Sequence, residues 1–330
     1  MTPSEITVRP AAAADNEAMI ALELQSALDM GEAEQLFDRS PDAFACCRVQ
    51  DSCRILVAEL DRCVAAMMAG VMIRPIVQGH VRTLVYIHRA RVHPDFQHRG
   101  AAMALSSDLF AWAGRQGGEG PCYAIAPANA PSLSFVERGG GRWPLDVCLV
   151  DIETDQAVPG EAQPILDEHL PEVVRVVNDA HAGEDFFEPL TLESLKARLN
   201  RDESYSLASM RGVFANGRLV AVGGLLDKGA YTRQIRIDRS TGEETWTRGA
   251  AIVDWGIAPG HEDASAEVLT SLGAEARSLG RSTVTICEPH HDAVSMVLPH
   301  RRLGLSLFTP SLKPPPASRI SGLYLDLLNL

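Results

Sequence analysis

The order of predicted elements in the first 150 residues recurs in the second half, and this recurrence constrains the fold more than any other feature. One predicted strand ends at Val92-His-Pro, and another ends 165 residues later at Ile257-Ala-Pro. Two glycines that follow predicted helices, Gly140 and Gly304, are separated by 164 residues. Two features at nearly the same offset predict a tandem repeat of one domain.

Hydrophobic periodicity and turn residues predict a mixed order of strands and helices in the first half. The expected strands cover residues 6–9, 55–60, 64–73, 81–93, 122–126 and 145–152. The expected helices cover residues 15–27, 32–37, 41–48, 99–116 and 131–138. Strands in this order, with helices on both faces, predict an α/β fold (an α+β mixed sheet).

The second half has a similar pattern, after a stretch without periodicity. Residues 154–164 are rich in Pro, Gly and polar residues, so we expect a linker between domains 1–153 and 165–330. Helices are expected at 170–182, 191–200, 262–279 and 293–303. Strands are expected at 206–215, 218–226, 245–256, 283–287 and 323–328, the first two joined by the hairpin turn Asn216-Gly217.

Composition excludes several classes of protein. The 330 residues are 46% hydrophobic with a net charge of −13, which excludes wholesale disorder and argues against a nucleic-acid partner. No apolar run is long enough for a membrane span, and the first residues do not resemble a signal peptide. Seven cysteines, an odd number without a CxxC motif, predict free thiols in a reducing compartment and no metal site. These features predict a cytoplasmic protein.

The segment from Val92 to Leu105 predicts a turn that binds phosphate. Pro94 ends the strand, and Gln97, Gly100 and Ala102 lead directly into a helix. Small residues let a ligand approach the main chain, and the free amides of a helix start favour an anion, above all a pyrophosphate. Arg99 can add a positive charge. The alternative interpretation is an ordinary strand–turn–helix in which the glycine only eases the turn.

With these residues the chain resembles the GNAT family of acyl-CoA N-acyltransferases. The family signature, Arg/Gln-x-x-Gly-x-Gly/Ala after the fourth strand, is filled by Gln97, Gly100 and Ala102. The opening Ile6-Thr-Val-Arg-Pro with Asp15 resembles the first strand and helix of the family. Residues 129–139 resemble a later family segment. The resemblance covers residues 6–150 well and 160–330 weakly, and it implies two tandem GNAT folds.

The resemblance also implies a cofactor, acetyl-CoA, and the residues that bind it. The phosphates are expected at Gln97 and at the loop amides of His98, Arg99, Gly100, Ala101 and Ala102. The main chain of Ala90, Arg91 and Val92 is expected to hold the acetyl-pantetheine. On the other side of the cofactor the resemblance places Asn129, Ser132 and Phe135.

The residues that move protons depart from the family pattern. The family often places a Glu on the fourth strand and a Tyr after the later Phe, where this chain has Tyr86 and Val136. Period-2 alternation predicts that Tyr86, His88, Ala90 and Val92 share one strand face and that Arg89, Arg91 and His93 share the other. Tyr86 and His88 are therefore the candidate catalytic residues, His88 because its ordinary pKa is about 6.5. The alternative is that both side chains only pack against a helix.

The second copy of the loop departs further. Glu262 stands where the first copy has Gln97, and Ser265 stands where it has Gly100. Glu262, Asp263 and Glu267 suit a helix start but repel a pyrophosphate. We therefore expect a degenerate second copy that does not bind CoA.

Together these features predict an acetyl-CoA-dependent N-acetyltransferase that acts on an amine of a small molecule or peptide by direct transfer. The alternative function is a non-catalytic acyl-CoA-binding or regulatory protein, which the valine at position 136 favours. A homodimer is left open. The acceptor is not encoded in any motif of the sequence, because loops of variable sequence build such sites.

Overall fold

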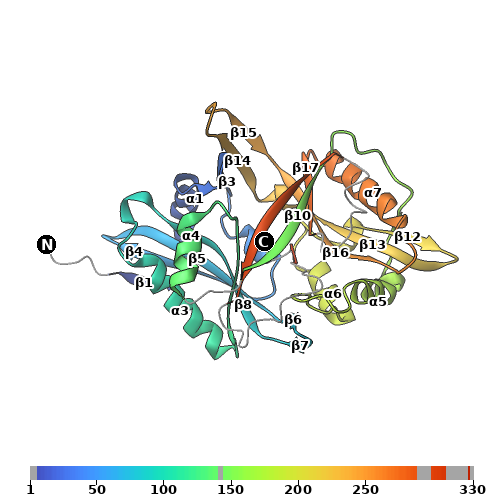
Figure 1. The fold of residues 1–330 in the computed structure, drawn as a ribbon, viewed down its shortest axis with the longest axis horizontal. Coiled ribbons are helices and arrows are strands. Elements are labelled where there is room, and N and C mark those ends of the chain that lie inside the picture. Colours follow the sequence, from blue (N-terminus) through green and yellow to red (C-terminus); the bar gives the residue numbers. More distant parts are fainter. Residues whose placement is uncertain (1–5, 140–143, 288–298, 310–325, 328–330) are drawn as a thin grey trace.

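The computed structural model describes residues 6–139, 144–287, 299–309 and 326–327. It confirms the predicted α/β fold with a mixed sheet: twelve strands form one sheet that runs through both halves of the chain (Figure 1). Every helix that the structure describes is too short or too polar to span a lipid bilayer.

The two halves of the chain place their strands in nearly the same order, when each half is read inward from its own edge of the sheet. From one edge come the first-half strands β1 (Thr7–Pro10), β4 (Cys53–Leu60), β5 (Cys63–Ile73), β8 (Leu84–Val92) and β9 (Gly120–Ile125). From the other edge come β11 (Gln163–Pro164), β12 (Met210–Ala215), β13 (Arg218–Leu226), β16 (Gly249–Ile257) and β17 (Thr283–Cys287). Each half contributes a β-hairpin, β4–β5 or β12–β13, followed by a nine-residue strand.

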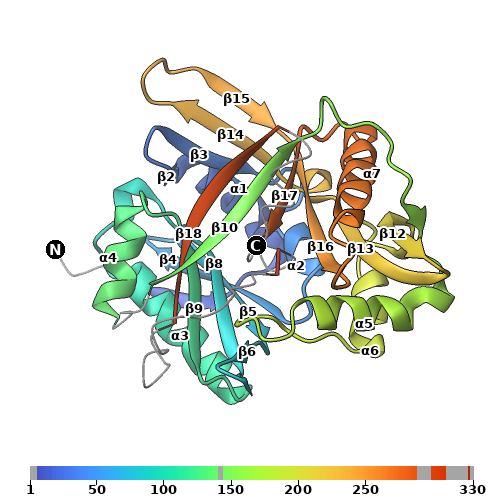
Figure 2. The same ribbon diagram turned by 45° about the vertical axis from the view of Figure 1, so that its right-hand side comes forward.

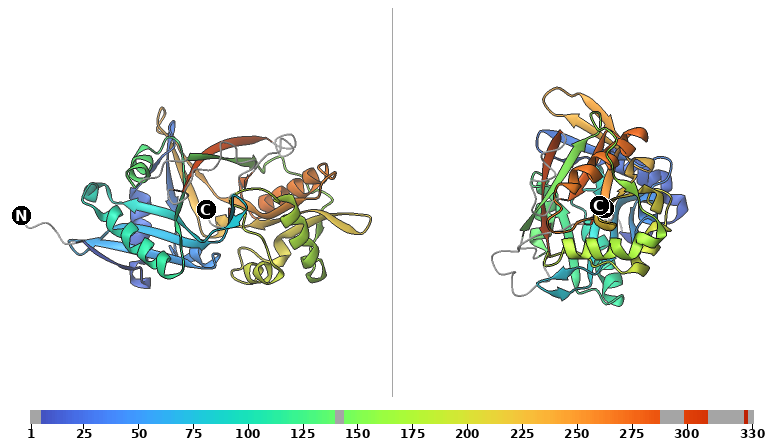
Figure 3. Two further views of the ribbon diagram at one scale, coloured as in Figure 1. Left: turned by 60° about the horizontal axis from the view of Figure 1, so that its bottom comes forward. Right: turned by 90° about the vertical axis from the view of Figure 1, so that its right-hand side faces the viewer.

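The last strand of each half is exchanged with the other half. The strand β10 (Pro144–Glu153) ends the first half but pairs with β17 of the second, and β18 (His300–Phe308) pairs with β9 of the first. The two exchanged strands also pair with each other over nine positions, from Pro144–Phe308 to Ile152–His300. They lie side by side between the halves (Figures 2 and 3).

Helices cover both faces of the sheet in the first half. Leu105 and Leu109 of α3 pack on one face of β5 against Met68, whereas Met19 of α1 packs on the other face against Met67. The helices are α1 (Asn16–Gln25), α2 (Ala45–Arg48), α3 (Ala101–Arg115), α4 (Ala130–Arg138), α5 (Leu170–Ala180), α6 (Leu192–Leu199) and α7 (Ala264–Ser278). Short 3-10 turns are η1 (Ala13–Asp15), η2 (Pro94–Phe96), η3 (Asp167–His169), η4 (Leu207–Ser209) and η5 (Lys228–Ala230).

A second, four-stranded sheet connects the halves and corrects one prediction. Residues 32–37 were expected to be helical, but β3 (Ala33–Asp38) is a strand that pairs with β14 (Arg233–Asp238). The polar and apolar residues of this segment fit the period of a helix as well as that of a strand. Pairing with β14, about 200 residues away in the chain, favours the strand. The other strands of this sheet are β2 (Leu28–Asp29) and β15 (Glu244–Thr247), and β6 (Ile76–Val77) and β7 (His80–Val81) form a separate small ribbon.

Three further predictions differ from the structure. The strand expected over 245–256 is interrupted at Arg248, which separates β15 in the small sheet from β16 in the large one. Residues 300–303 were expected to be helical but belong to β18, because they complete the sheet beside β9 and β10. Residues 293–298 of that expected helix, Gly140, and residues 323–325 and 328 lie outside the described residues, whereas Leu327 lies in a turn rather than a strand.

The strands β8 and β16 show the repeat most directly. Both have nine residues, they start 165 residues apart, and each runs parallel to the strand that follows it, β9 or β17. The sixth residue of each adopts a left-handed backbone: Arg89 has φ 52° and Asp254 has φ 48°. A shift of strand register accompanies each, opposite Met67–Ala69 and Val222–Gly224. The two halves thus share a detail of backbone conformation as well as a strand order.

Candidate functional site

The loop between β8 and α3 has the conformation that the glycine pattern predicts. Gly100 is the N-cap of α3 and has φ +92°, a left-handed conformation that favours glycine. His98 is also left-handed, with φ +62°. The residues Gln97, His98, Arg99 and Gly100 are exposed. The loop is therefore open to a ligand from outside.

The main-chain amides at this helix start are available. Among the described residues, no acceptor takes a hydrogen bond from the amides of Arg99, Ala101 or Ala102, and the first turn of α3 contains no acidic residue. Arg99 lies over the ring of Phe96, with 5.1 Å between its guanidinium carbon and the ring centre. Free amides, the helix dipole and a nearby guanidinium together favour an anion at this position.

The strand β8 has a free edge next to this loop. Its pairing with β9 runs from Leu84–Gly120 to Ile87–Tyr123 and then stops, whereas its pairing with β5 continues to Val92. Within the described part of the chain, residues 88–92 therefore have no ladder partner on the side of β9. Ala90, Arg91 and Val92, which we expect to hold the acetyl-pantetheine, lie in this stretch.

The irregularity at Arg89 corrects the predicted strand faces. Two residues, Arg89 and Ala90, stand opposite Met68 alone, so the period-2 alternation fails at this point. The side chains of Arg89 and Arg91 consequently lie on the same side of β8 as His88, buried toward α1, whereas Ala90 is exposed. Simple alternation, which placed the arginines on the opposite face, was wrong here.

The helix α4 brings together three of the predicted residues. Asn129 is its N-cap, and the Asn129 side-chain oxygen accepts a hydrogen bond from the amide of Ser132 at 3.3 Å. Asn129 is buried, and Phe135 packs against the core under α3. In this structure, Asn129 and Ser132 have a local structural reason to be where they are. Their contact with a cofactor remains a prediction.

A buried group of charges lies on the α1 side of β8. The carboxylate of Glu23 is 0% exposed, and it accepts hydrogen bonds from Nε of Arg39 at 3.1 Å and from Nε of Arg89 at 3.0 Å. Burial raises the pKa of Glu23, but the charges of Arg39 and Arg89 outweigh burial and lower it to about 2. Sequence reasoning missed this group because its members come from α1, from the end of β3 and from β8.

Two further cations lie in the same place. Arg91 is 7% exposed, and burial lowers its pKa to about 10. Lys228, which comes from the second half, is partly buried, and burial followed by the charge of Arg39 lowers its pKa to about 8. Two guanidinium groups, those of Arg39 and Arg91, lie over the ring of Phe37 at 5.4 and 5.6 Å.

This environment affects both candidate catalytic residues. Burial, and then the positive charges of Arg89 and Arg39, lower the pKa of His88 to about 3. Tyr86 is 1% exposed in the core, and burial raises its pKa well above the ordinary value. Near neutral pH, both groups are uncharged in the unliganded protein. Their catalytic roles remain predictions.

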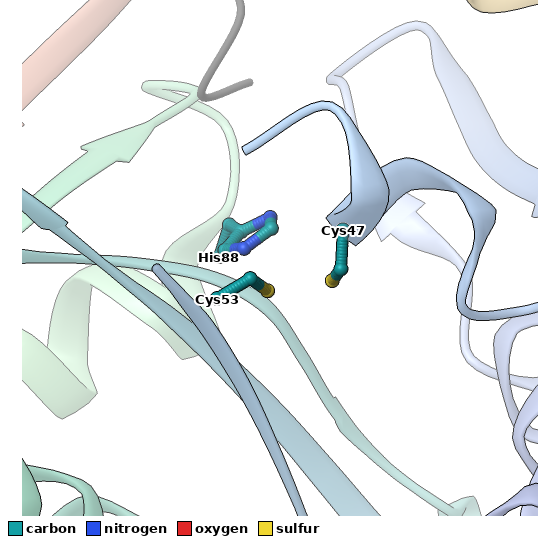
Figure 4. A group of neighbouring side chains, drawn as sticks. All are labelled: Cys47, Cys53 and His88. Carbon is teal, nitrogen blue, oxygen red and sulfur yellow. The ribbon is translucent and has the colours of Figure 1, made fainter. Parts of the chain in front are cut away.

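The structure also brings together Cys47, Cys53 and His88, whose ligand atoms lie within 4.8 Å of one another (Figure 4). The sequence spacing gave no signal for this group, since His88 is far from both cysteines along the chain. In the metal-free protein, the hydrogen bond with Cys46 lowers the pKa of Cys47, but the hydrogen bond with Cys53 and burial outweigh it and raise the pKa to about 12. The positive charges of Arg89 and Arg39, which lower the pKa of His88, disfavour a cation at this place. The absence of a metal site stays a prediction from the sequence.

The start of α7, the second copy of the loop, is closed. The carbonyl of His261 accepts the amide of Ala264 at 2.9 Å, and the carbonyl of Glu262 accepts the amide of Ser265 at 3.1 Å. The carboxylate of Glu262 accepts the amide of Gly260 at 3.0 Å. The amides of Ala264 and Ser265, which stand where the first copy has Arg99 and Gly100, are thus satisfied within the chain.

Comparison with known proteins supports this description. The model of the acetyltransferase (GNAT) family matches residues 18–141. No curated protein sequence matches the chain. Among solved structures, Saccharomyces cerevisiae N-myristoyltransferase with bound myristoyl-CoA has 9% identity and a TM-score of 0.66, and the match covers 96% of this chain and 84% of that chain. A GCN5-related N-acetyltransferase from Sphaerobacter thermophilus has 15% identity and a TM-score of 0.57, covering 92% and 96%.

At such low identities the solved structures show the fold alone, and they do so over almost the whole length of this chain. The family model is more specific, because its range contains β8, the loop at Gly100 and the start of α3. It ends before β10 and leaves the second half unmatched. Residues 18–141 therefore match the acetyltransferase (GNAT) family, within a chain whose overall fold is GNAT-like.

Proposed function

We propose that the first half of the chain transfers an acetyl group from acetyl-CoA to an amine of a small molecule or peptide. The observation that carries this proposal is the open helix start at Gly100, with unpaired amides, beside the free edge of β8. The match of residues 18–141 to the GNAT family supports the same function. The proposed domains are residues 1–153 and 165–330, with residues 154–164 as a linker.

The loop and the strand have separate roles in the proposed mechanism. The amides of His98, Arg99, Gly100, Ala101 and Ala102, next to Gln97, hold the phosphates of the cofactor. The main chain of Ala90–Val92 holds the pantetheine and polarises the thioester carbonyl. The amine nitrogen forms a bond to the carbonyl carbon, the carbon–sulfur bond breaks, and one proton passes from the nitrogen to a base while the thiolate leaves.

His88 is the proposed proton acceptor, on one condition. A base whose conjugate acid has a pKa near 3 takes a proton from an amine poorly, so the effects of burial and of the neighbouring positive charges on His88 need to be offset when the acceptor binds. Tyr86 is too deeply buried to reach a substrate directly, and a role for it would have to act through His88, whose ring lies 6.0 Å away.

The acyl group is part of the proposal, because one structural neighbour was solved with myristoyl-CoA. A series of acyl-CoA donors of increasing chain length tests it. We expect acetyl-CoA to give the highest kcat/KM for thiol release in the presence of an amine panel. A higher kcat/KM for a long-chain donor would replace acetyl transfer with another acyl transfer.

We further propose that the second copy does not bind CoA, because the amides of Ala264 and Ser265 are satisfied internally and Glu262, Asp263 and Glu267 lie at its helix start. Seven free cysteines support a reducing compartment, and we propose the cytoplasm.

A non-catalytic acyl-CoA-binding protein is the second candidate function. Two observations favour it: the buried Val136 stands where the family often has a tyrosine, and the pKa of His88 is low. Calorimetry with acetyl-CoA and thiol release over an amine panel separate the two functions. Binding with turnover supports the transferase, binding without turnover on any amine supports the second candidate, and absence of binding excludes both.

A further inference from the structure

Two cysteines of the first half face each other across a short loop. Cys47 is the third residue of α2, and Cys53 is the first residue of β4. Their sulfur atoms and a ring nitrogen of His88 all lie within 4.8 Å of one another. Figure 4 shows the two sulfur atoms pointing toward each other, with the His88 ring beside them. Two thiols in this arrangement are candidates for a disulfide bond.

The backbone around this pair can absorb the approach of the two sulfur atoms. A disulfide needs a sulfur–sulfur distance of about 2.05 Å, so at least one of the two side chains has to turn. The helix α2 has only four residues, and residues 49–52, which connect it to Cys53, belong to neither a helix nor a strand. A small adjustment at Cys47 therefore leaves the large sheet intact.

Both thiols of the pair are accessible to a small reagent. Cys47 and Cys53 are partly exposed, whereas Cys46, the neighbour of Cys47, is buried. The connecting loop also contains two exposed residues, Arg48 and Asp51. A disulfide that closes a short, partly exposed loop is readily reduced again, so the bond would be reversible.

Cys46 already has other partners. Its sulfur accepts a hydrogen bond from a terminal nitrogen of Arg89 at 3.1 Å, and its thiol donates to the carbonyl of Ala43 at 3.8 Å. Adjacent residues of a helix also point in directions about 100° apart around the axis, which disfavours a bond between Cys46 and Cys47. The geometry therefore favours Cys53 as the partner of Cys47.

The loop between the two cysteines is also held by the second half of the chain. The side chain of Arg201 donates to the carbonyl of Val49 at 3.2 Å and to the carboxylate of Asp51 at 2.8 Å. A bond between Cys47 and Cys53 would close this loop into a ring. The oxidised ring would thus lie at a contact between the two halves, next to the strand that carries the proposed base.

We propose that Cys47 and Cys53 form a reversible disulfide, which makes the region beside His88 a redox-sensitive site. The oxidant is a small-molecule disulfide. One protein thiolate bonds to a sulfur of this reagent and expels a thiolate, and the second protein sulfur then displaces the other half of the reagent. Two protein thiols are oxidised, one small disulfide is reduced to two thiols, and these thiols take up the two protons. The inference does not depend on the proposed transfer.

Peptide mapping of the wild-type protein tests the bond directly. Trypsin cleaves after Arg39, Arg48 and Arg54, so Cys47 and Cys53 fall in separate peptides, residues 40–48 and 49–54. The probe is bis(2-hydroxyethyl) disulfide, which is neutral, and iodoacetamide then blocks the remaining thiols. The reaction should take hours near neutral pH, because the thiolate is the attacking species and the pKa of Cys47 is raised to about 12.

We expect the two peptides to be recovered as one linked species, with the loss of two hydrogen atoms, and we expect dithiothreitol to separate them. Recovery of Cys47 and Cys53 as free thiols, after exposed Cys63 has reacted completely, would overturn the proposal. Recovery of both as separate mixed disulfides with the reagent would also overturn it. The wild-type map decides between these results without any variant, so a variant that fails to fold does not remove the test.

Variants assign the bond within the first peptide, which contains Cys46 as well as Cys47. The linked species should persist in Cys46→Ser and should be lost in Cys47→Ser and in Cys53→Ser. In the last two variants the remaining cysteine of the pair should stop at a mixed disulfide with the reagent. The matched control, Cys63→Ser, removes an exposed cysteine of the first half and should leave the linked species unchanged. A link that persists in Cys47→Ser, or is lost in Cys46→Ser, would assign the bond to Cys46 and overturn the proposal.

Metal analysis of the purified protein covers the competing use of the same side chains. We expect no bound zinc and the same disulfide yield after treatment with a chelator. One equivalent of zinc that is present in the wild type, is absent from His88→Ala and prevents the link would assign the three side chains to a metal and overturn the proposal. Neither acetyl-CoA nor an amine enters any of these measurements. Failure of the transferase proposal is therefore distinguishable from failure of this one.

Discussion

The starts of α3 and α7 occupy equivalent places in the two halves and present different surfaces to an anion. At α3, Gly100 turns the chain and the following amides have no acceptor among the described residues. At α7, carbonyls of His261 and Glu262 accept the amides of Ala264 and Ser265, which stand where the first copy has Arg99 and Gly100, and three acidic residues lie at the helix start. The same strand–loop–helix geometry can therefore be open to a phosphate or closed to it. Local hydrogen bonds decide, and the fold does not.

A second difference concerns the left-handed residues of β8 and β16. Arg89 pairs with Glu23, whereas Asp254 pairs with Arg198 at 2.8 Å and accepts a hydrogen bond from Tyr205 at 2.6 Å. The backbone conformation is the same in both halves, and the sign of the buried charge is inverted. Each left-handed residue belongs to a buried ion pair. The left-handed residue is the cation in β8 and the anion in β16.

The largest expected effect breaks the first of these ion pairs. Glu23→Gln leaves Arg39 and Arg89 buried without a counter-charge, so the free energy of unfolding should fall by about 3–5 kcal/mol. Denaturant titration measures the loss. The matched variant Asp254→Asn should cost less, because Asp326 remains 2.9 Å from its arginine partner. Equal losses in the two variants would contradict this account of the difference.

Acid should act on the same pair. The pKa of Glu23 is about 2 in the folded protein against 4.5 ordinarily, so the folded state holds its proton less tightly than the unfolded state. The stability from Glu23 is fully present above about pH 4.5 and is lost as the pH falls toward 2. The shift corresponds to about 3 kcal/mol. The gap in unfolding free energy between wild type and Glu23→Gln should therefore close over this range, and a gap independent of pH would refute it.

Closing the first loop with charge should remove cofactor binding. Gly100→Glu places a side chain in a left-handed position and a negative charge beside the α3 amides, so the Kd for acetyl-CoA should rise about 100-fold. Calorimetry measures it. The matched control is Gly260→Glu, since Gly260 is a left-handed glycine (φ +80°) of the second loop, and it should leave the Kd unchanged. Equal affinities for Gly100→Glu and wild type would remove the assignment of the loop.

Removing the buried charge of Lys228 should stabilise the protein. Burial, and then the charge of Arg39, lower the pKa of Lys228 from the ordinary 10.5 to about 8, while Cys46 and Asp151 act in the opposite direction. The unfolded state thus binds its proton more tightly, and wild-type stability should rise between pH 8 and 10.5. Lys228→Met should be more stable than wild type by about 1–3 kcal/mol at pH 7, and this advantage should vanish by pH 10.5. Thermal unfolding over this range checks both signs; a less stable variant at pH 7 would contradict them.

The smallest effect is expected in the second loop. Neutralising Glu262, Asp263 and Glu267 together removes the repulsion of an anion, but the amides of Ala264 and Ser265 remain bound to carbonyls. We expect one acetyl-CoA per chain before and after this change. Only the stability of α7 should fall, by about 0.3–1 kcal/mol for each lost charge at the helix start. A second bound acetyl-CoA would show that charge alone closes the site.

Local signals made some of these features predictable. Pro94 ends β8 and the small residues after Gly100 begin α3, so the sequence indicates the loop and its place. The repeat was predictable from the spacing of Val92 and Ile257. The left-handed Arg89 was not, because arginine has little preference for that conformation and its partner, Glu23, lies 66 residues earlier.

The other features depend on contacts between distant segments, so they could not be predicted from the sequence. Residues 33–38 are a strand because β14 pairs with them, and that strand comes from the second half. The buried cations Arg39, Arg89, Arg91 and Lys228 come from the residue after β3, from β8 and from η5, and no local spacing connects these segments. The exchange of β10 and β18 is likewise a property of the whole sheet, since each strand matches the pattern of an ordinary last strand.

The exchanged strands make the two halves one cooperative unit. A fragment that ends after β10 would lack β18, the neighbour of β9, and both strands that pair with β10 in the whole chain. The arrangement is that of a strand-swapped dimer whose two halves are joined in one chain. We therefore expect a destabilising substitution in the core of the second half to unfold the first half as well, although no residue of the loop at Gly100 has changed. This dependence gives a reason to preserve the second half even if, as we propose, it binds no cofactor.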